Sequence, residues 1–336
     1  MARVKKYRKS TSVLFCWDAR PIGDLHSRWH SLRVTTLDKC AGTGTHPSAV
    51  PRGQSGVALA LGGGFARGFA HLGVLQVFEE HHIPISHIAG TSVGSILGAA
   101  YASGAPLARI MATCRTLRFR DIARWRMSRL GLASNHRLTD LIERVFEVRT
   151  FEELRIPMAV VATDLESGEP VTFMEGDLVD PIRASCAFPG IFEPVEIGTR
   201  WLADGGLVAP VPSRAARSLG ASTVIGVSVG VPERQRGAPS NIFQVVSRAV
   251  CAAQKHQLEL WEPYADLVLR PDVRSLAWDD FHRADEAIEA GATAARNALP
   301  RIEQLLARNG EATQWMERSA AAPLPVDMRE AQAVPS

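Results

Sequence analysis

The stretch that decides the fold reads Gly90-Thr91-Ser92-Val93-Gly94. An apolar segment, residues 83–89, precedes it, and a run of small residues with helical character, 93–102, follows it. A serine at a tight turn between a strand and a helix is typical of a nucleophile elbow, which exposes the hydroxyl at the corner. Glycines on either side fit because side chains there would crowd the turn, and the amides of the helix N-terminus favour negative charge. Alone, the pattern is also compatible with a turn that ends in a helix-capping serine.

A glycine-rich loop lies upstream, between a second apolar segment and a second helical pattern. The segment Val57–Leu61 is predicted to be a buried strand because all of its residues are apolar. The loop that follows reads Gly62-Gly63-Gly64-Phe65-Ala66-Arg67-Gly68. Its backbone N–H groups can bind an anion. Because the loop matches neither the Walker A pattern nor G-x-G-x-x-G, it predicts either an oxyanion hole or a tight turn.

Two shorter blocks follow farther along the chain. Asp204-Gly205-Gly206 comes after a short strand predicted at Thr199–Ala203, and alone it is typical of a turn. The other block reads Ala184-Ser185-Cys186-Ala187-Phe188-Pro189-Gly190 and indicates the end of a helix followed by a Pro-Gly turn. Neither block indicates chemistry by itself.

In this order, the four blocks resemble the patatin-like phospholipase family, specifically its bacterial branch, which is related to the catalytic domain of neuropathy target esterase. The resemblance covers residues 57–229 and continues weakly to 306. It implies an α/β fold, a three-layer α/β/α sandwich with a mainly parallel sheet. It also implies that Ser92 is the nucleophile and Asp204 its partner. The other site residues that it implies are Gly62, Gly63, Gly64, Phe65, Arg67 and Gly68 in the oxyanion hole, Gly90, Thr91, Val93 and Gly94 in the nucleophile elbow, and Gly205 and Gly206 in the acid motif.

Phe65 departs from the family pattern, in which the loop usually reads G-G-G-G-A-R-G. The ring is predicted to narrow the acyl entrance beside the nucleophile. A bulky residue is also strained if this position requires a positive φ. The departure bears on rate and acyl chain length more than on the type of reaction.

The general base is expected to be Asp204 rather than a histidine. A conventional triad places a histidine after the acid, but the later candidates, His256 and His282, lie in no motif. His71, just past the glycine loop, is interpreted as a packing or capping residue. An aspartate with a pKa near about 3.9 is a weak base, but burial can raise that pKa and the oxyanion amides can stabilise the transition state.

Other residues carry less specific signals. Asp164 is interpreted as a turn residue before Ser167-Gly168, and Arg67 as either a ligand of the lipid phosphate or a brace of the glycine loop. The stretch Leu117–Leu132 mixes basic and apolar residues, which is compatible with a membrane-facing surface, a solvated helix face or a flap near the site. Three aromatic residues are expected in the core: Trp261, Trp278 and Phe281.

The alternation of apolar strands and amphipathic helices favours one α/β domain. Strands are predicted at Val57–Leu61, His87–Ala89, Met158–Thr163, Val171–Met174, Pro194–Ile197, Thr223–Val229 and Ala265–Leu269. Helices are predicted at Ala66–His81, Val93–Ala102, Leu107–Thr116, Leu138–Val145, Leu178–Ala187, Pro212–Leu219, Ile242–Trp261 and Asp285–Ala307.

The chain has 336 residues, and its first part differs from the rest in charge. Up to Gly53 there are ten Lys and Arg against three Asp and Glu, so residues 1–55 are predicted to be a basic, disordered arm and linker. Residues 56–310 are predicted to form the acyl hydrolase domain, with a motif core at 57–229 and a helical part at 240–310, and residues 311–336 a disordered tail. The basic charge of the arm is also compatible with a peripheral contact between the protein and an anionic membrane.

Composition and spacing argue against several classes of protein. No segment has the length and hydrophobicity of a transmembrane helix or a secretory signal. The five cysteines share no C-x-x-C spacing, which indicates reduced thiols and no zinc site. We expect a cytoplasmic protein, at most peripheral at the inner face of the membrane, with no metal, no cofactor and no nucleic-acid partner.

These observations predict a serine acyl hydrolase that cleaves carboxylic esters of lipids, phospholipid or lysophospholipid. Ser92 and Asp204 would act as a dyad through an acyl-enzyme intermediate, with amides around Gly63, Gly64 and Phe65 holding the oxyanion. Two alternatives stay open: an acyltransferase or thioesterase that uses the same serine, and a non-catalytic regulatory or adaptor protein on a patatin-like fold. Phe65 favours the adaptor, whereas the intact dyad opposes it.

Overall fold

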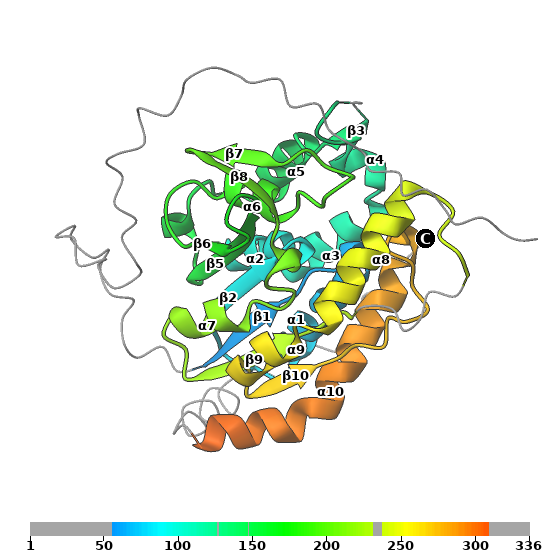
Figure 1. Ribbon diagram of the computed structural model, residues 1–336. Helices are drawn as coiled ribbons and strands as arrows, with labels where there is room; N and C mark the ends of the chain where they lie inside the picture. Colours follow the sequence, from blue (N-terminus) through cyan, green and yellow to red (C-terminus); the bar gives the residue numbers. More distant parts are fainter. Residues whose placement is uncertain (1–55, 126–127, 147, 231–236, 309–336) are drawn as a thin grey trace, which may run out of the picture. The chain divides into compact units, whose positions relative to one another are not determined.

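The computed structural model describes residues 56–125, 128–146, 148–230 and 237–308 (Figure 1). The predictions for the arm at 1–55 and the tail at 311–336 lie outside the described residues. An eight-stranded sheet runs in the order β10-β9-β1-β2-β5-β8-β7, with β6 paired to β5. Its strands are β1 (Val57–Leu61), β2 (Ile85–Thr91), β5 (Met158–Asp164), β6 (Pro170–Phe173), β7 (Val195–Ile197), β8 (Arg200–Asp204), β9 (Thr223–Val227) and β10 (Leu267–Leu269). Two short strands, β3 (Arg124–Trp125) and β4 (Ala133–Ser134), pair separately.

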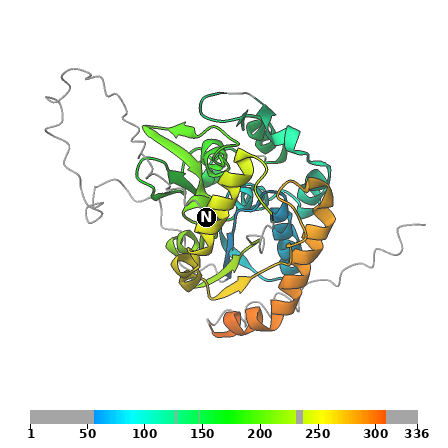
Figure 2. The ribbon, with the colours of Figure 1, turned by 45° about the vertical axis from the view of Figure 1, so that its right-hand side comes forward.

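Helices cover both faces of the sheet, as the two views of the ribbon show (Figures 1 and 2). The α-helices are α1 (Ala70–Glu80), α2 (Val93–Ala102), α3 (Leu107–Thr116), α4 (Phe119–Ile122), α5 (Arg137–Val145), α6 (Val179–Ser185), α7 (Ser213–Ser218), α8 (Ile242–Lys255), α9 (Leu258–Trp261) and α10 (Ala284–Arg308). Short 3₁₀ helices are η1 (Phe65–Phe69), η2 (Phe151–Glu153), η3 (Gly205–Leu207), η4 (Glu262–Tyr264) and η5 (Phe281–Arg283). In the part of the chain that the structure describes, none of the helices combines the length and hydrophobicity needed to cross a bilayer.

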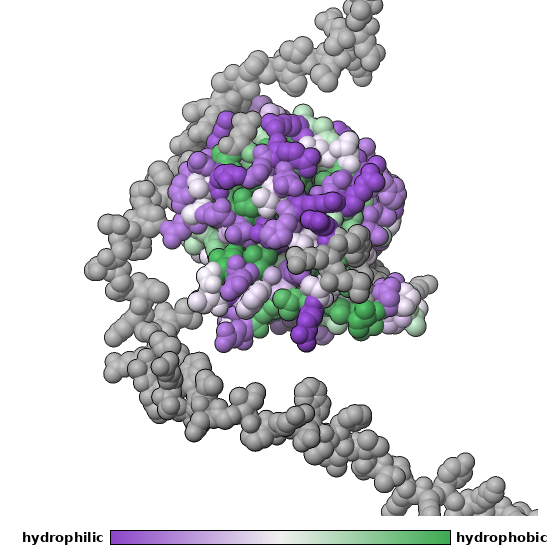
Figure 3. Space-filling model, turned by 90° about the horizontal axis from the view of Figure 1, so that it is seen from above, coloured by the Kyte–Doolittle hydropathy of each residue, from purple (hydrophilic) through white to green (hydrophobic). Residues whose placement is uncertain are grey.

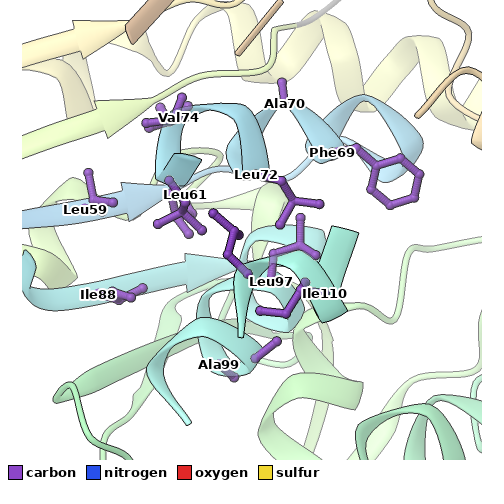
Figure 4. Packing of buried hydrophobic residues seen from close by; sticks show 14 of the residues in the cluster. Leu59, Leu61, Phe69, Ala70, Leu72, Val74, Ile88, Leu97, Ala99 and Ile110 are labelled. Carbon is purple, nitrogen blue, oxygen red and sulfur yellow. The ribbon is translucent and has the colours of Figure 1, made fainter. Parts of the chain in front are cut away.

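Strand β1 explains how the sequence produces the layers. All of its residues are buried, and its side chains alternate between the two faces of the sheet. Leu59 and Leu61 pack in the cluster that contains Ile88 and residues of α1 and α2 (Figure 4), whereas Ala58 and Ala60 belong to a separate cluster with residues of α7. A parallel strand that is covered on both faces needs apolar residues throughout. The predicted three-layer α/β/α sandwich with a mainly parallel sheet is therefore confirmed.

The pairing register brings the sequence blocks together at one edge of the sheet. Between the parallel strands β1 and β2, Leu61 pairs with Gly90. On the other side of β2, Thr91 pairs with a residue of β5, and the next residue of β5 pairs with Asp204 of the antiparallel strand β8. The ends of β1, β2 and β8 therefore meet at the same level, at the edge where ligands of open α/β sheets usually bind.

Most predicted elements are confirmed to within a few residues, and two differ in a way that has a physical cause. The predicted helix Ala66–His81 begins as the 3₁₀ turn η1 and continues as α1. The prediction of a single helix at Ile242–Trp261 was wrong, because the chain forms α8 and α9 there. The amides of His256 and Gln257 each donate to the carbonyl three residues back, and this tighter pattern ends the α-helix.

Candidate active site

Ser92 lies at a strained corner between β2 and α2. Its φ of 53° is in the left-handed region, which residues other than glycine rarely adopt. A Cβ atom at Gly90 would come within 2.5 Å of the Cα atom of Ser95, and one at Gly94 within 2.1 Å of a backbone oxygen of β1, so the corner requires both glycines. The Ser95 hydroxyl donates to the Ser92 carbonyl at 2.6 Å and stabilises the turn. Strain of this kind persists where the surrounding structure holds it in place, as at functional sites.

Asp204 faces Ser92 directly. The Ser92 hydroxyl donates to Oδ2 of Asp204 at 2.8 Å, and the amide of Gly206 donates to Oδ1 at 2.8 Å. Only 7% of Ser92 and 4% of Asp204 is exposed. Burial raises the pKa of Asp204 to about 6, although the hydrogen bonds from Gly206 and Ser92 act in the opposite direction. The carboxylate is therefore a stronger base than an exposed aspartate.

The glycine loop lies against Ser92, but only part of it offers free amides. A Cβ atom at Gly63 would come within 3.2 Å of the Cβ atom of Ser92. The amides of Gly62 and Gly63 each donate to a backbone carbonyl at 3.1 Å. Among the described residues, the amides of Gly64 and Phe65 have no acceptor. Gly63 was expected to donate to the oxyanion, but its amide donates to the carbonyl of Pro210. The amides of Gly64 and Phe65 are the ones that a ligand beside Ser92 could use.

Phe65 sits in a strained conformation between two other aromatic residues. Its φ is 52°, so the residue that replaces the usual glycine is in the left-handed region. The ring packs edge-on against Phe188 and Trp278, with ring centroids 5.4 and 5.2 Å away. Trp278, expected in the core, is half-buried at the edge of a core cluster. It also packs on the glycine loop, where its carbonyl accepts from the amide of Ala66 at 3.1 Å. Trp278 follows β10, so only the tertiary fold brings it to the loop.

Two cavities meet at Ser92 and Phe65, which line both of them. The first, which we call the apolar pocket, is narrow, with a volume of about 70 Å³. It lies among α2, α3 and α5, and its walls include Leu97, Ile110 and Phe281. Phe281 is a core residue as expected, with 5% of its surface exposed, but its ring also forms part of this pocket. The pocket offers an environment for a hydrocarbon chain.

The second cavity, which we call the polar cleft, is wider, with a volume of about 560 Å³. Asp204 and the glycine loop form its floor, and α8 and the segment after β10 form its sides. Trp261, expected in the core, is buried and also lines this cleft. Charged side chains on its walls are Arg67, Lys255, Arg270, Asp272 and Arg274.

Arg67 is the buried cation of the polar cleft. It is 8% exposed, and its Nη1 donates to the carbonyl of Gly230 at 2.8 Å, whereas its Nε has no hydrogen-bond partner. No carboxylate of the described residues pairs with it, and burial lowers its pKa. The side chain therefore braces the loop and also presents uncompensated positive charge to the cleft, so the two predicted roles are compatible.

Ser185 and His71 hold the site in ways that the sequence did not indicate. The amide of Ser92 donates to the Ser185 hydroxyl at 2.8 Å, and that hydroxyl donates to the carbonyl of Val161 on β5 at 2.6 Å. Nε2 of His71 donates to the Gly62 carbonyl at 2.8 Å, and burial lowers the pKa of His71 to about 4, so its ring is neutral. Ser185 lies in the small-residue block at 184–190, the only signal that could have pointed to it.

As far as the structure describes them, the remaining candidates make no hydrogen bond to Ser92. Asp164 accepts from the amide of Glu166 at 2.9 Å in the turn after β5, which confirms that it is a turn residue. His256 and His282 line neither cavity. In the stretch 117–132, the apolar Leu117 and Ile122 line the apolar pocket, while the arginines that the structure describes are exposed. Within the described ranges, no three His, Cys, Asp or Glu residues are grouped as a metal ion would need, and the expectation of no metal and no cofactor stays a prediction.

Comparison with protein families identifies the domain that carries this site. The patatin-like phospholipase family model matches residues 59–217, which include the glycine loop, the elbow, the small-residue block and the Asp204 turn. The chain therefore carries a patatin-like phospholipase domain, as the four sequence blocks predicted.

Curated relatives support the same assignment. An uncharacterized NTE family protein of Mycobacterium tuberculosis is 38% identical over 189 residues, which cover 54% of this chain and 52% of that protein. Human patatin-like phospholipase domain-containing protein 6 is 33% identical over 182 residues, 52% of this chain and 13% of that protein. Lysophospholipase NTE1 of Debaryomyces hansenii is 28% identical over 281 residues, 74% of this chain and 18% of that protein. The chain thus spans about half the length of the mycobacterial relative, and far less of the others.

Among solved structures, VipD from Legionella pneumophila is similar with a TM-score of 0.43 and 13% identity, over 76% of this chain and 67% of that chain. A TM-score this low adds nothing to the assignment.

Proposed function

We propose that Ser92 and Asp204 hydrolyse a carboxylic ester of a lipid. The observation that carries the proposal is the 2.8 Å hydrogen bond from the Ser92 hydroxyl to a buried carboxylate whose pKa is raised to about 6. A base with a pKa near the working pH is well suited to accept a proton and to return it.

The reaction follows from this geometry. Oγ of Ser92 attacks the ester carbonyl carbon while its proton moves to Asp204, and the carbonyl oxygen becomes an anion that accepts from the free amides of Gly64 and Phe65. When the tetrahedral intermediate collapses, the bond to the alcohol breaks, and Asp204 returns the proton to the leaving oxygen. Water then attacks the acyl group on Ser92 by the same route and releases a fatty acid.

The two cavities support an amphiphilic substrate. The apolar lining of the narrow pocket suits the part of an acyl chain next to the ester, and the charged lining of the polar cleft suits a polar headgroup, with the ester bond at Ser92 where the two meet. Arg67 faces the cleft without a carboxylate partner among the described residues, and a guanidinium is a strong ligand for phosphate. We therefore favour a phospholipid or lysophospholipid over a neutral acylglycerol. The lysophospholipase name of the Debaryomyces relative is in keeping with this choice.

Among the described residues, Phe65 is the feature that favours the adaptor alternative, and the hydrogen bond between Ser92 and Asp204 opposes it. No observation on these residues favours the acyltransferase or the thioesterase. A cytoplasmic location and a peripheral position at the inner face of the membrane stay predictions.

Release of fatty acid from lysophosphatidylcholine tests the proposal. Ser92→Ala is expected to abolish it, and Asp204→Asn to lower kcat/KM by roughly 10²–10⁴-fold, the usual effect of losing a general base. Ser103→Ala is the matched control, because Ser103 is a buried serine whose hydroxyl donates to the carbonyl of Ala100 and which lines neither cavity. Hydrolysis at near wild-type rate in Ser92→Ala would rule out the proposed nucleophile.

A further inference from the structure

Helix α8, which lies toward the viewer in Figure 1, contributes one side of the polar cleft and is tied to the catalytic turn. Ser247, Val250 and Cys251 on its inner face line the cleft. Nε2 of Gln254 donates to the carbonyl of Gly206 at 2.7 Å, two residues from Asp204. Just after the helix, Nε2 of Gln257 donates to the Leu207 carbonyl at 2.7 Å. The outer face of α8 is therefore held beside the mouth of the cleft.

That outer face is apolar and uncovered. None of the α8 side chains that the structure describes is buried. Apart from Lys255, the exposed ones are Ile242, Val245, Ala249, Ala252 and Ala253. They recur at the spacing of three and four that places residues on one side of a helix, and 73% of Ile242 and 46% of Val245 is exposed. The outer face of a surface helix in a water-soluble domain is normally polar, whereas this apolar one has no partner among the residues that the structure describes.

The apolar surface continues into α9, where 44% of Leu258 and 66% of Leu260 is exposed. Figure 3 shows apolar side chains gathered at the edge of the molecule that faces the viewer in Figure 1, where α8 runs, whereas polar side chains cover most of the face above. From Gly237 to Trp261, which includes α8 and α9, the sequence contains two basic residues, Arg248 and Lys255, and one acidic residue, Glu259 on α9. An apolar helix face whose surrounding charge is net positive is the chemistry of a helix that lies on an anionic lipid surface.

We propose that the outer face of α8 docks on an anionic bilayer, with Ile242 and Val245 inserted among the lipid headgroups. Docking there brings the mouth of the polar cleft next to the membrane, so a lipid can reach Ser92 with little exposure to water. The benefit for catalysis depends on the function proposed above, whereas the docking itself does not.

Sedimentation with vesicles tests the docking apart from catalysis. The full chain carrying Ser92→Ala is mixed with phosphatidylcholine vesicles that contain about 30% phosphatidylserine, a lipid that gives the surface a negative potential. Salt at about 0.5 M screens long-range attraction of basic segments such as the N-terminal arm and leaves apolar insertion intact. The double variant Ile242→Ser with Val245→Ser is expected to bind these vesicles at least about tenfold more weakly, because the apolar area of the two side chains is no longer buried in the bilayer.

Leu165→Ser with Met174→Ser is the matched control, because 49% and 45% of these side chains is exposed and neither lines a cavity. The control pair is expected to bind like the parent. Equal binding of the two double variants, or no binding by the parent, would overturn the proposal. A third outcome would also overturn it: the parent is a dimer, the α8 variant is a monomer, and both bind vesicles equally. The outer face of α8 would then be an interface between copies of the chain.

Hydrolysis of a soluble short-chain ester separates this proposal from the proposed function. With Ser92 present, Ile242→Ser with Val245→Ser is expected to keep that activity, because neither side chain lines a cavity, and to lose activity on vesicles. If the parent hydrolyses no ester but the variant still loses vesicle binding, the docking surface stands and the proposed reaction fails.

Discussion

Replacing Asp204 with asparagine is expected to stabilise the fold while it removes the base. Burial raises the pKa of Asp204 from 3.8 to about 6, so the folded protein binds this proton more tightly than the unfolded chain does. Stability therefore falls as pH rises from 3.8 to about 6, and the full cost is present above the folded pKa. A shift of about two units corresponds to about 3 kcal/mol. Asparagine has no charge to bury and is free of this cost.

Asparagine also fits the hydrogen bonds of the site. Its Oδ1 can accept from the Gly206 amide as the carboxylate does, and its Nδ2 can donate to the Ser92 hydroxyl. The hydrogen of the Ser92 hydroxyl loses Asp204 as its acceptor and can turn toward the polar cleft that Ser92 lines. This loss offsets part of the gain, and the change in charge dominates the effect.

Urea unfolding at two pH values measures the effect. At pH 8 the Asp204→Asn variant is expected to be more stable than the wild type by up to about 3 kcal/mol, and at pH 5 the gap should shrink to about half. Asp164→Asn is the control, and it is expected to lower stability at pH 8. The hydrogen bond from the Glu166 amide lowers the pKa of Asp164, so its charge stabilises the turn. If Asp204→Asn is less stable at pH 8, or if the gap does not change with pH, burial does not penalise this carboxylate.

Three further substitutions test the parts around the dyad. Phe65→Gly removes the ring between the two cavities and a strained φ of 52°, and it should widen the range of acyl chains hydrolysed or raise turnover; unchanged kcat/KM across short and long esters would show that the ring does not limit access. Arg67→Gln should lower kcat/KM on lysophosphatidylcholine at least about tenfold more than on monoacylglycerol, because a charged hydrogen bond to phosphate is lost; equal losses on both substrates would mean that Arg67 only braces the loop. Ser185→Ala leaves the Ser92 amide without its acceptor at 2.8 Å and should lower kcat by about tenfold, with KM little changed; a wild-type kcat would show that the elbow does not need this bond.

Local patterns predicted the strands and the elbow, whereas the pairing of Ser92 with Asp204 was expected from the resemblance to the patatin-like family. Five consecutive apolar residues at 57–61 are the pattern of a strand covered on both faces, and that strand lies inside the sheet. A Cβ atom at either glycine of the elbow would come within 2.5 Å of a backbone atom, so the turn accepts only glycine at these positions. The four blocks meet because the pairing register places the ends of β1, β2 and β8 at one level.

The surroundings of the dyad depend on contacts between distant segments, and these leave no local pattern. Trp278 contacts Phe65 although the two residues are far apart in the sequence, and the amide of Gly63 donates to the carbonyl of Pro210, which is also distant in the sequence. Neither residue type signals such a partner in advance. The end of α8 depends on a few backbone hydrogen bonds at His256 and Gln257, while the residues on both sides have good helix propensity.

Labelling with a fluorophosphonate probe tests the central claim most directly, because the probe reacts only with an activated serine. The modified residue would be located by mass spectrometry in the wild type, Ser92→Ala and Ser103→Ala. A Ser92 activated by Asp204 predicts one adduct on Ser92 in the wild type and in Ser103→Ala, and none in Ser92→Ala. An adduct on another serine, or undiminished labelling of Ser92→Ala, would contradict it.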